Sequence, residues 1–280
     1  MKKILFICDG KNYPEGLISM ARWWNEREPI LLTGVFLSLT DYSRLAAAST
    51  NLDGVLVSPL VYQLTEDDEK VAAEQISRFS TECLKHHIEF RIHDDVVYRS
   101  LEELLKETRY ADLMLLSDTL FYGDLFGEQP NEYMREVLRK SDCPVLLVPE
   151  TFPEITRTVL TYDGSIGSMH AIRQFAYLFS EVLKDAETEL IHLKEGAPED
   201  LPEANRLEEY LGRHFPKLTL HSFSEQDQFD LSHFLEQRPG AIVVSGAFSR
   251  SGFSMLLKGS FIMPVLRQHH FPIFLSHCKK

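Results

Sequence analysis

Two places in the second half of the chain gather glycines, hydroxyls and a carboxylate, a combination that suits a phosphate-bearing ligand. The first is Thr161-Tyr-Asp-Gly-Ser165, and the second is Gly246-Ala-Phe-Ser249, followed after nine residues by Gly259-Ser260. Glycines let a backbone turn tightly and approach a ligand closely. Ser260 is placed to cap a helix after Gly259, and a helix N-terminus offers free N–H groups to a phosphate.

The elements that would position these residues are short apolar runs bounded by turn residues, which predict strands buried on both faces of a parallel sheet. The runs lie at Lys3–Cys8, Leu113–Leu116, Thr158–Leu160 and Ala241–Val244, and two more follow a proline at Val145–Val148 and Ile273–Leu275. Helical patterns separate them, at 71–88, 100–108, 165–184, 201–214 and 227–237. This alternation predicts βαβ units with right-handed crossovers.

The two halves of the sequence repeat one another. Ser117 and Ser245 each close a strand and lie 128 residues apart. Asp9 and Asp163 each follow the first strand of a half but lie 154 residues apart. The first half therefore holds 26 extra residues, the difference between these spacings, and they fit best at about 40–66.

We therefore predict two domains, at 1–150 and 154–280, joined where Pro149 and Pro153 discourage regular structure. The predicted fold class is α/β, with two tandem doubly wound parallel-sheet domains. If the strand order is 3-2-1-4-5, the carboxyl ends of the first and fourth strands meet at a switch point, where ligands bind in such sheets. Both ligand-like places follow strands of this kind.

These residues resemble the universal stress protein family. Members carry an aspartate after the first strand, often as D-G-S, and G-x-x-G, nine residues, then glycine and a serine or threonine after the fourth. This chain has Asp163-Gly-Ser165, then Gly246 to Ser249, nine residues, and Gly259-Ser260. The resemblance covers essentially the whole chain as two family domains in tandem, and it implies an adenine nucleotide alpha hydrolase-like fold with strand order 3-2-1-4-5.

The resemblance implies that ATP or AMP, with Mg²⁺, binds in the second domain. The implied contacts are Asp163, Leu193, Gly246, Ser249, Gly259 and Ser260, with Leu193 lining the base pocket at the end of the second strand. The chain departs from the pattern in two places. Ser249 replaces the second glycine and adds a side chain where the backbone should approach phosphate, and Thr161 stands where binders often have proline.

The first domain departs further from the pattern. Asp118, Phe121, Asn131 and Glu132 stand where the second domain has Gly246, Ser249, Gly259 and Ser260. Carboxylates near a triphosphate repel it, and a phenylalanine ring obstructs its approach. We therefore expect the first domain to bind no ATP, so its site is degenerate.

Three functions stay open. The first is a stress-response or regulatory protein that senses ATP or AMP in the second domain. The second is an interaction protein without nucleotide, which recognises a protein partner or an apolar ligand, and the third and weaker one is a slow nucleotide hydrolase. No G-x-S-x-G, H-E-x-x-H or Walker motif occurs in the sequence, and we identify no catalytic or metal-binding residues.

Charge and composition limit the classes of partner that the protein is expected to bind. The formal net charge of −13 disfavours nucleic acid and anionic membrane surfaces. No apolar run approaches the length of a membrane span, and four cysteines without a C-x-x-C pair suit a reducing cytoplasm. In the family, single domains pair through their last strands, here Val145–Val148 and Ile273–Leu275. The resemblance thus implies an intrachain pseudo-dimer and permits a homodimer.

Overall fold

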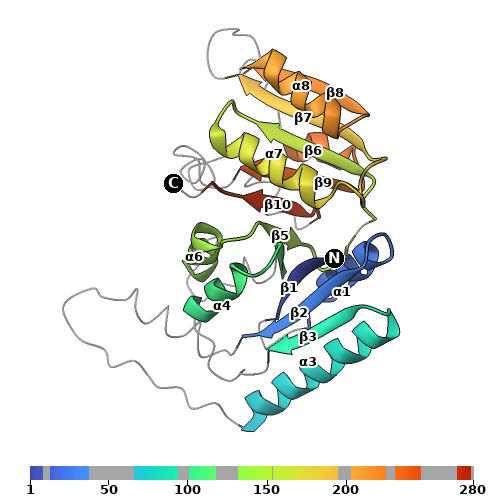
Figure 1. Cartoon of the computed structure of the whole chain (residues 1–280), viewed down its shortest axis with the longest axis vertical. Coiled ribbons are helices and arrows are strands. Elements are labelled where there is room, and N and C mark those ends of the chain that lie inside the picture. Colours follow the sequence, from blue (N-terminus) through green and yellow to red (C-terminus); the bar gives the residue numbers. More distant parts are fainter. Residues whose placement is uncertain are drawn as a thin grey trace, which may run out of the picture. The chain divides into compact units, whose positions relative to one another are not determined.

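The chain forms two compact α/β units, Met1–Cys143 and Pro144–Lys280, in a computed structural model (Figure 1). The structure describes residues 1–8, 13–37, 66–93, 101–117, 132–152, 154–194, 203–224, 231–246 and 270–278. The predicted insertion at about 40–66 lies almost wholly outside these residues. Each unit is described by itself below.

The first unit is built on four parallel strands in the order β3-β2-β1-β4. The strands are β1 (Lys2–Cys8), β2 (Ile30–Phe36), β3 (Glu89–His93) and β4 (Leu113–Ser117). The helices are α1 (Glu15–Asn25), α3 (Glu66–Lys85), α4 (Leu101–Thr108) and α6 (Glu132–Lys140). The predicted run at Lys3–Cys8 is thus a strand, and its apolar residues from Ile4 onward are fully buried.

The second unit has six strands in the order β5-β10-β9-β6-β7-β8. The strands are β5 (Val145–Val148), β6 (Arg157–Tyr162), β7 (Glu187–Lys194), β8 (Leu218–Ser224), β9 (Ala241–Gly246) and β10 (Ile273–Ser276). The helices are α7 (Ile166–Leu178), α8 (Ala204–His214) and α9 (Leu231–Glu236). All neighbouring strands run parallel except β5 and β10, which pair antiparallel with Ile273 opposite Leu147.

The predicted fold class is confirmed. In the second repeat the order β8-β7-β6-β9-β10 is the doubly wound order 3-2-1-4-5, and the first repeat follows the same order as far as β4. Strand β5, the fifth of the first repeat along the chain, falls in the second compact unit because it pairs with β10. The sequence-based domain limits of 1–150 and 154–280 stay a prediction beside this division.

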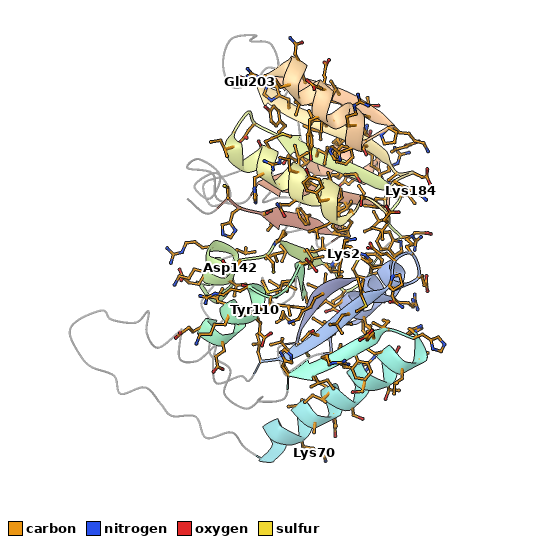
Figure 2. All side chains as sticks on the ribbon, viewed as in Figure 1. Lys2, Lys70, Tyr110, Asp142, Lys184 and Glu203 are labelled. Atoms are coloured by element: carbon orange, nitrogen blue, oxygen red, sulfur yellow. The ribbon has the colours of Figure 1, made fainter. Side chains whose placement is uncertain are left out.

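Aromatic side chains pack together in the core of each unit, and Figure 2 draws the side chains of the described residues on the ribbon. In the first unit the Phe79 ring of α3 lies 5.0 Å from Phe6 and 5.7 Å from Phe36, measured between ring centroids. In the second unit Phe175 of α7 stacks at 4.4 Å on Phe179, the residue that caps the end of this helix, and both meet Phe274 of β10 edge-on. Burial of such rings supplies most of the stabilisation of small α/β units.

Helix α7 is shorter than predicted. The pattern predicts a helix over 165–184, but α7 ends at Leu178 and the chain continues in turns to β7. The hydroxyl of Ser180 donates to the carbonyl of Tyr177, a local bond that competes with the helical pattern. Its start agrees with the prediction, because Ser165 caps the helix.

Candidate functional site

Asp163 lies at the carboxyl end of β6, in a turn that leads directly into α7. Its Oδ1 accepts a hydrogen bond from the backbone N–H of Ser165 at 2.9 Å. Gly164 has φ of 77°, a conformation that favours glycine. Ser165 then caps α7, since its hydroxyl oxygen accepts from the backbone N–H of Ser168 at 3.1 Å. The D-G-S sequence therefore folds into a tight turn that aims a carboxylate along the start of the helix.

The Asp163 carboxylate is held in its charged form. Burial works against the charge, but hydrogen bonds from Ser165 and Ser168 outweigh it and lower the pKa of Asp163 below its ordinary value. A negative charge beside the N-terminus of α7 also suits the dipole of that helix. Asp163 is thus an ionised hydrogen-bond acceptor at neutral pH.

Gly246 ends β9 in direct contact with the first turn of α7. A Cβ atom on Gly246 would lie 2.6 Å from the carbonyl carbon of Gly167 and 2.7 Å from the backbone nitrogen of Ser168. No side chain fits there. Gly246 and Asp163 therefore meet the same helical turn from two strands, β9 and β6, at the switch point of the sheet.

The sequence alone did not predict that Gly246 packs against Gly167. The sequence predicts Gly246 as a point of close approach to phosphate, and the structure adds that a Cβ there would meet backbone atoms of α7. A glycine at the second position of a helix facing a strand-end glycine is the signal that could have found the contact. The two glycines let β9 and α7 approach without an intervening side chain.

Thr161 and His192 tie the strand ends together, and sequence reasoning did not assign them these roles. The hydroxyl of Thr161 donates to the carbonyl of Val244 at 2.9 Å and so joins β6 to β9. His192 is buried on β7, and its Nδ1 lies 3.0 Å from the carbonyl oxygen of Tyr162. The residue that replaces the usual proline thus cross-links two strands beneath the candidate site.

Tyr162 lies just before the candidate carboxylate. Burial, and then the nearby charges of Glu203 and Asp163, raise its pKa. Glu203 comes from the start of α8, so the amino end of that helix faces the same strand ends. The hydroxyl of Tyr162 therefore stays protonated at neutral pH.

The remaining predicted contacts are described less fully. Leu193 lies at the end of β7, paired with Phe223 of β8, and its side chain lies outside the described set. Ser249, Gly259 and Ser260 also lie outside the described residues. Of the predicted site, the structure therefore brings together Asp163 and Gly246.

The corresponding end of the first unit has a different chemistry. Cys8 ends β1, and its thiol donates to Oε1 of Gln75 from α3 at 2.8 Å. Tyr13 lies beside Phe6, and the Arg78 guanidinium lies 4.2 Å from the centre of the Tyr13 ring. Of the four residues that make this site degenerate in sequence, Asp118, Phe121 and Asn131 lie outside the described part, as does the side chain of Glu132.

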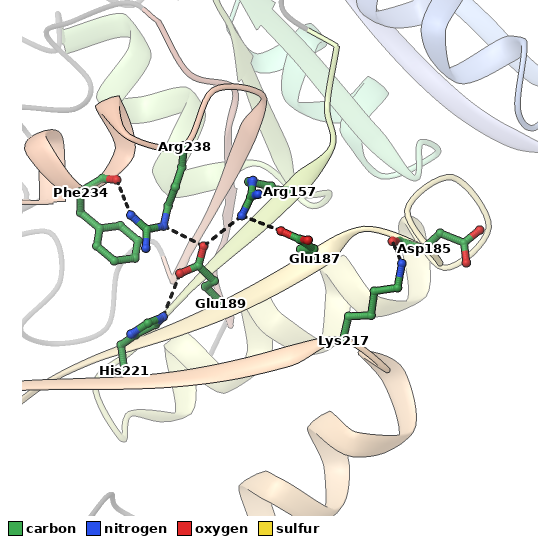
Figure 3. A network of polar contacts seen from close by, with 8 residues as sticks. All are labelled: Arg157, Asp185, Glu187, Glu189, Lys217, His221, Phe234 and Arg238. Atoms are coloured by element: carbon green, nitrogen blue, oxygen red, sulfur yellow. Dashed lines mark hydrogen bonds and ion pairs between the residues drawn. The ribbon is translucent and has the colours of Figure 1, made fainter.

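A second polar cluster lies near the amino ends of β6 and β7, away from the candidate site at their carboxyl ends (Figure 3). Its centre is Glu189, which is 8% exposed. The Glu189 carboxylate accepts from Arg238 Nε at 2.7 Å and lies 2.8 Å from His221 Nε2. Arg157 Nη1 lies 3.7 Å from the same carboxylate and 2.6 Å from Glu187.

The cluster stabilises its central charge. Burial alone would raise the pKa of Glu189, but Arg238 and His221 outweigh it and lower the pKa. Arg238 also donates to the carbonyl of Phe234 and stacks on its ring, with 3.4 Å from the guanidinium carbon to the ring centre. The cluster thus joins α9 to β6, β7 and β8 on one face of the sheet.

Metal and membrane sites have no support in the described part of the chain. Among those residues no three His, Cys, Asp or Glu side chains are grouped so that they could hold a metal ion. None of the helices that the structure describes is long and apolar enough to cross a lipid bilayer.

Comparison with known proteins identifies the fold. The chain is similar to the crystal structure of a universal stress protein from Archaeoglobus fulgidus DSM 4304, with a TM-score of 0.67 and 14% sequence identity. The similarity covers 99% of this chain and 96% of that one. No family model matches the sequence, and no curated protein matches it. The resemblance inferred from the sequence is therefore confirmed at the level of the fold.

Proposed function

We propose that the second unit binds an adenine nucleotide, ATP or AMP, at the carboxyl ends of β6 and β9, and that the chain is a stress-response or regulatory protein. The observation that carries the proposal is the pairing of the ionised Asp163 carboxylate with Gly246 on one turn of α7. A carboxylate there can accept hydrogen bonds from ribose hydroxyls or the adenine amino group. The switch point of an open α/β sheet is where such ligands settle.

The phosphates would be held by the segment after β9. We expect Ser249, Gly259 and Ser260 to donate to them, and Mg²⁺ to accompany ATP. Leu193, one strand away from Asp163 at the end of β7, would line the base pocket. We also propose, as the sequence predicts, that the protein is cytoplasmic and that the two repeats pair as a pseudo-dimer through their last strands.

The experiment is calorimetric titration of the full chain with ATP and Mg²⁺, and separately with AMP. Asp163→Asn keeps an oxygen for the Ser165 N–H but removes the charge, so we expect at least a ten-fold loss of affinity. Gly259→Asp places a carboxylate near the phosphates and should weaken ATP more than AMP. Asp9→Asn is the matched control in the first repeat and should leave the affinity unchanged.

Absence of binding heat for the wild type at millimolar ATP and millimolar AMP would contradict the proposal. Equal affinities for the wild type, Asp163→Asn and Gly259→Asp would show that the site lies elsewhere. A thermal unfolding scan of each variant keeps loss of binding separate from loss of the fold.

One observation favours a second candidate, an interaction protein that binds no nucleotide. The contact of Gly246 with α7 packs β9 against this helix, and the hydrogen bonds of Asp163 stabilise its own turn. Both stabilise the fold without any ligand. The strand ends would then serve to recognise a protein partner or an apolar ligand. The same titration separates the two candidates, because this one predicts no heat with either nucleotide.

A further inference from the structure

We propose that two copies of the chain associate through the outer edge of β8, which pairs antiparallel with itself across a two-fold axis. Strand β8 comes last in the sheet order of the second unit, and within the described part of the chain a strand pairs with it on the β7 side alone. A strand in this position presents a row of N–H and C=O groups that can template another strand.

The composition of β8 leaves this edge unprotected. Its seven residues, LTLHSFS, include no proline and no lysine, arginine, aspartate or glutamate. The edge strand of the first unit, β3, is shorter and reads EFRIH, with the exposed charges of Glu89 and Arg91. Natural edge strands are usually guarded by such charges, by proline or by short length. β8 lacks all three devices.

The imidazole of β8 does not guard the edge either. Glu189 holds the His221 ring at 2.8 Å on the face covered by α9, as Figure 3 shows. The other charged groups in this cluster are Arg238, Arg157 and Glu187, which come from the turn after α9 and from the starts of β6 and β7. His221 is thus occupied inside its own copy.

A groove runs along the same strand on the opposite face. It has a volume of about 750 Å³, and its walls include Leu190, Leu220 and Ser222 on the sheet and Glu203, Arg206 and Glu208 on α8. Leu220 is 40% exposed, so its side chain is accessible at this edge. A strand added beside β8 would place its alternate side chains over Leu220 and against the first two turns of α8.

Charge and symmetry favour a second copy as the occupant. The net charge of −13 makes most surfaces of two copies repel one another, whereas β8 carries no carboxylate. His221 is the midpoint of the seven residues, so antiparallel pairing about His221 sets Leu220 of each copy opposite Ser222 of the other. An isologous pair of this kind satisfies both edges at once.

The last strand of the second repeat offers no comparable edge. Strand β10 pairs with β9 on one side and with β5 on the other, so its backbone groups are already committed. A single strand pair with two flanking helical turns lies at the small end of stable interfaces. We therefore expect a dimer that dissociates on dilution in the micromolar range.

The first test is the mass of the full chain by sedimentation equilibrium across a range of concentrations. We expect the wild type to approach twice 32.2 kDa. Leu220→Lys puts two like charges beside the axis and should weaken association at least ten-fold, measured as the dissociation constant. Ile92→Lys is the matched control, because Ile92 occupies the corresponding position of β3, and it should leave association unchanged.

A second variant keeps the proposal falsifiable if Leu220→Lys fails to fold. Ser222→Glu sets a carboxylate opposite Leu220 of the other copy and should weaken the dimer, while Ser180→Glu, which makes the same change in net charge away from the strand, should not. A wild type that stays monomeric at 100 µM, on the order of the highest concentration tested, would overturn the proposal and leave the groove to an extended peptide. A dimer insensitive to Leu220→Lys and to Ser222→Glu would overturn it too.

Discussion

Thr33 in the first repeat and Glu189 in the second occupy the same position of the shared fold. One side chain is a neutral hydroxyl, and the other is a charged carboxylate. Thr33 pairs with Leu5, Glu189 pairs with Val159, and these two partners lie 154 residues apart, like Asp9 and Asp163. Thr33 is fully buried, and its hydroxyl has no hydrogen-bond partner in the part of the chain that the structure describes.

The same position in the second repeat is the centre of a charged cluster. Glu189 is joined there by Arg238, His221 and Arg157. The strand register is the same in both repeats, so the sheet does not dictate which chemistry is buried. Partners from other elements decide it, because a buried carboxylate is tolerated only where cations and hydrogen bonds compensate its desolvation.

The largest effect is expected when the second repeat is given the residue of the first. Glu189→Thr leaves Arg238, His221 and Arg157 without their carboxylate and should lower the free energy of unfolding by about 3 kcal/mol. Glu187→Thr is the matched control. It removes a carboxylate that is 58% exposed and should cost less than about 1 kcal/mol. Urea unfolding followed by circular dichroism measures both.

Acid should bring the stabilities of these two variants closer together, because Glu187→Thr keeps Glu189 and Glu189→Thr does not. The pKa of Glu189 is lowered in the folded state, so its contribution to stability is present above its unfolded pKa and is lost as the pH falls through the folded value. The melting temperature of the wild type should therefore drop on acidification by more than that of Glu189→Thr. Parallel pH profiles would show that Glu189 is not linked to folding.

A smaller effect is expected at the contact between β9 and α7. Gly246→Ala places a Cβ against backbone atoms of Gly167 and should destabilise the second unit by about 2 kcal/mol. Gly212→Ala is the matched control, because a Cβ there meets nothing within 4 Å, and in a helix it should stabilise by about 0.5–1 kcal/mol. Thermal unfolding compares them, and equal melting temperatures would contradict the packing role of Gly246.

The smallest effect is expected at Thr33. Thr33→Val replaces an unbonded buried hydroxyl by a methyl group of similar volume, so the stability should stay level or rise by about 1 kcal/mol. A marked loss, measured by urea unfolding, would mean that the hydroxyl of Thr33 is satisfied and that the two repeats differ less than their contacts indicate.

Much of the fold could be predicted because its signals are local. The apolar run at Val145–Val148 is the strand β5 without change, and Ser165 caps α7 as its position in D-G-S suggests. The predicted end of α7 was wrong by six residues, because the helix ends at Leu178 and not at Lys184. The pattern continues to Lys184, but just after Leu178 the hydroxyl of Ser180 donates to the carbonyl of Tyr177.

The candidate site could be predicted only in part, because its contacts join distant segments. The place of Asp163 followed from its strand, whereas the contact of Gly246 with Gly167 depends on how closely a strand and a helix approach. The Glu189 cluster was not predicted at all. Its members come from positions 157, 189, 221 and 238, and nothing in their spacing shows that they share one face of a sheet.

Helix α7 is closely packed at both of its ends, so a displacement at one end has consequences at the other. Its first turn lies against Gly246 with no room for a side chain, and at its other end Phe175 and the C-cap residue Phe179 pack against Phe274 of β10. A close-packed helix cannot shift at one end without opening a void or a clash at the other. The helix therefore moves as a rigid body, so a displacement at the end of β9 would also displace β10 and alter its pairing with β5.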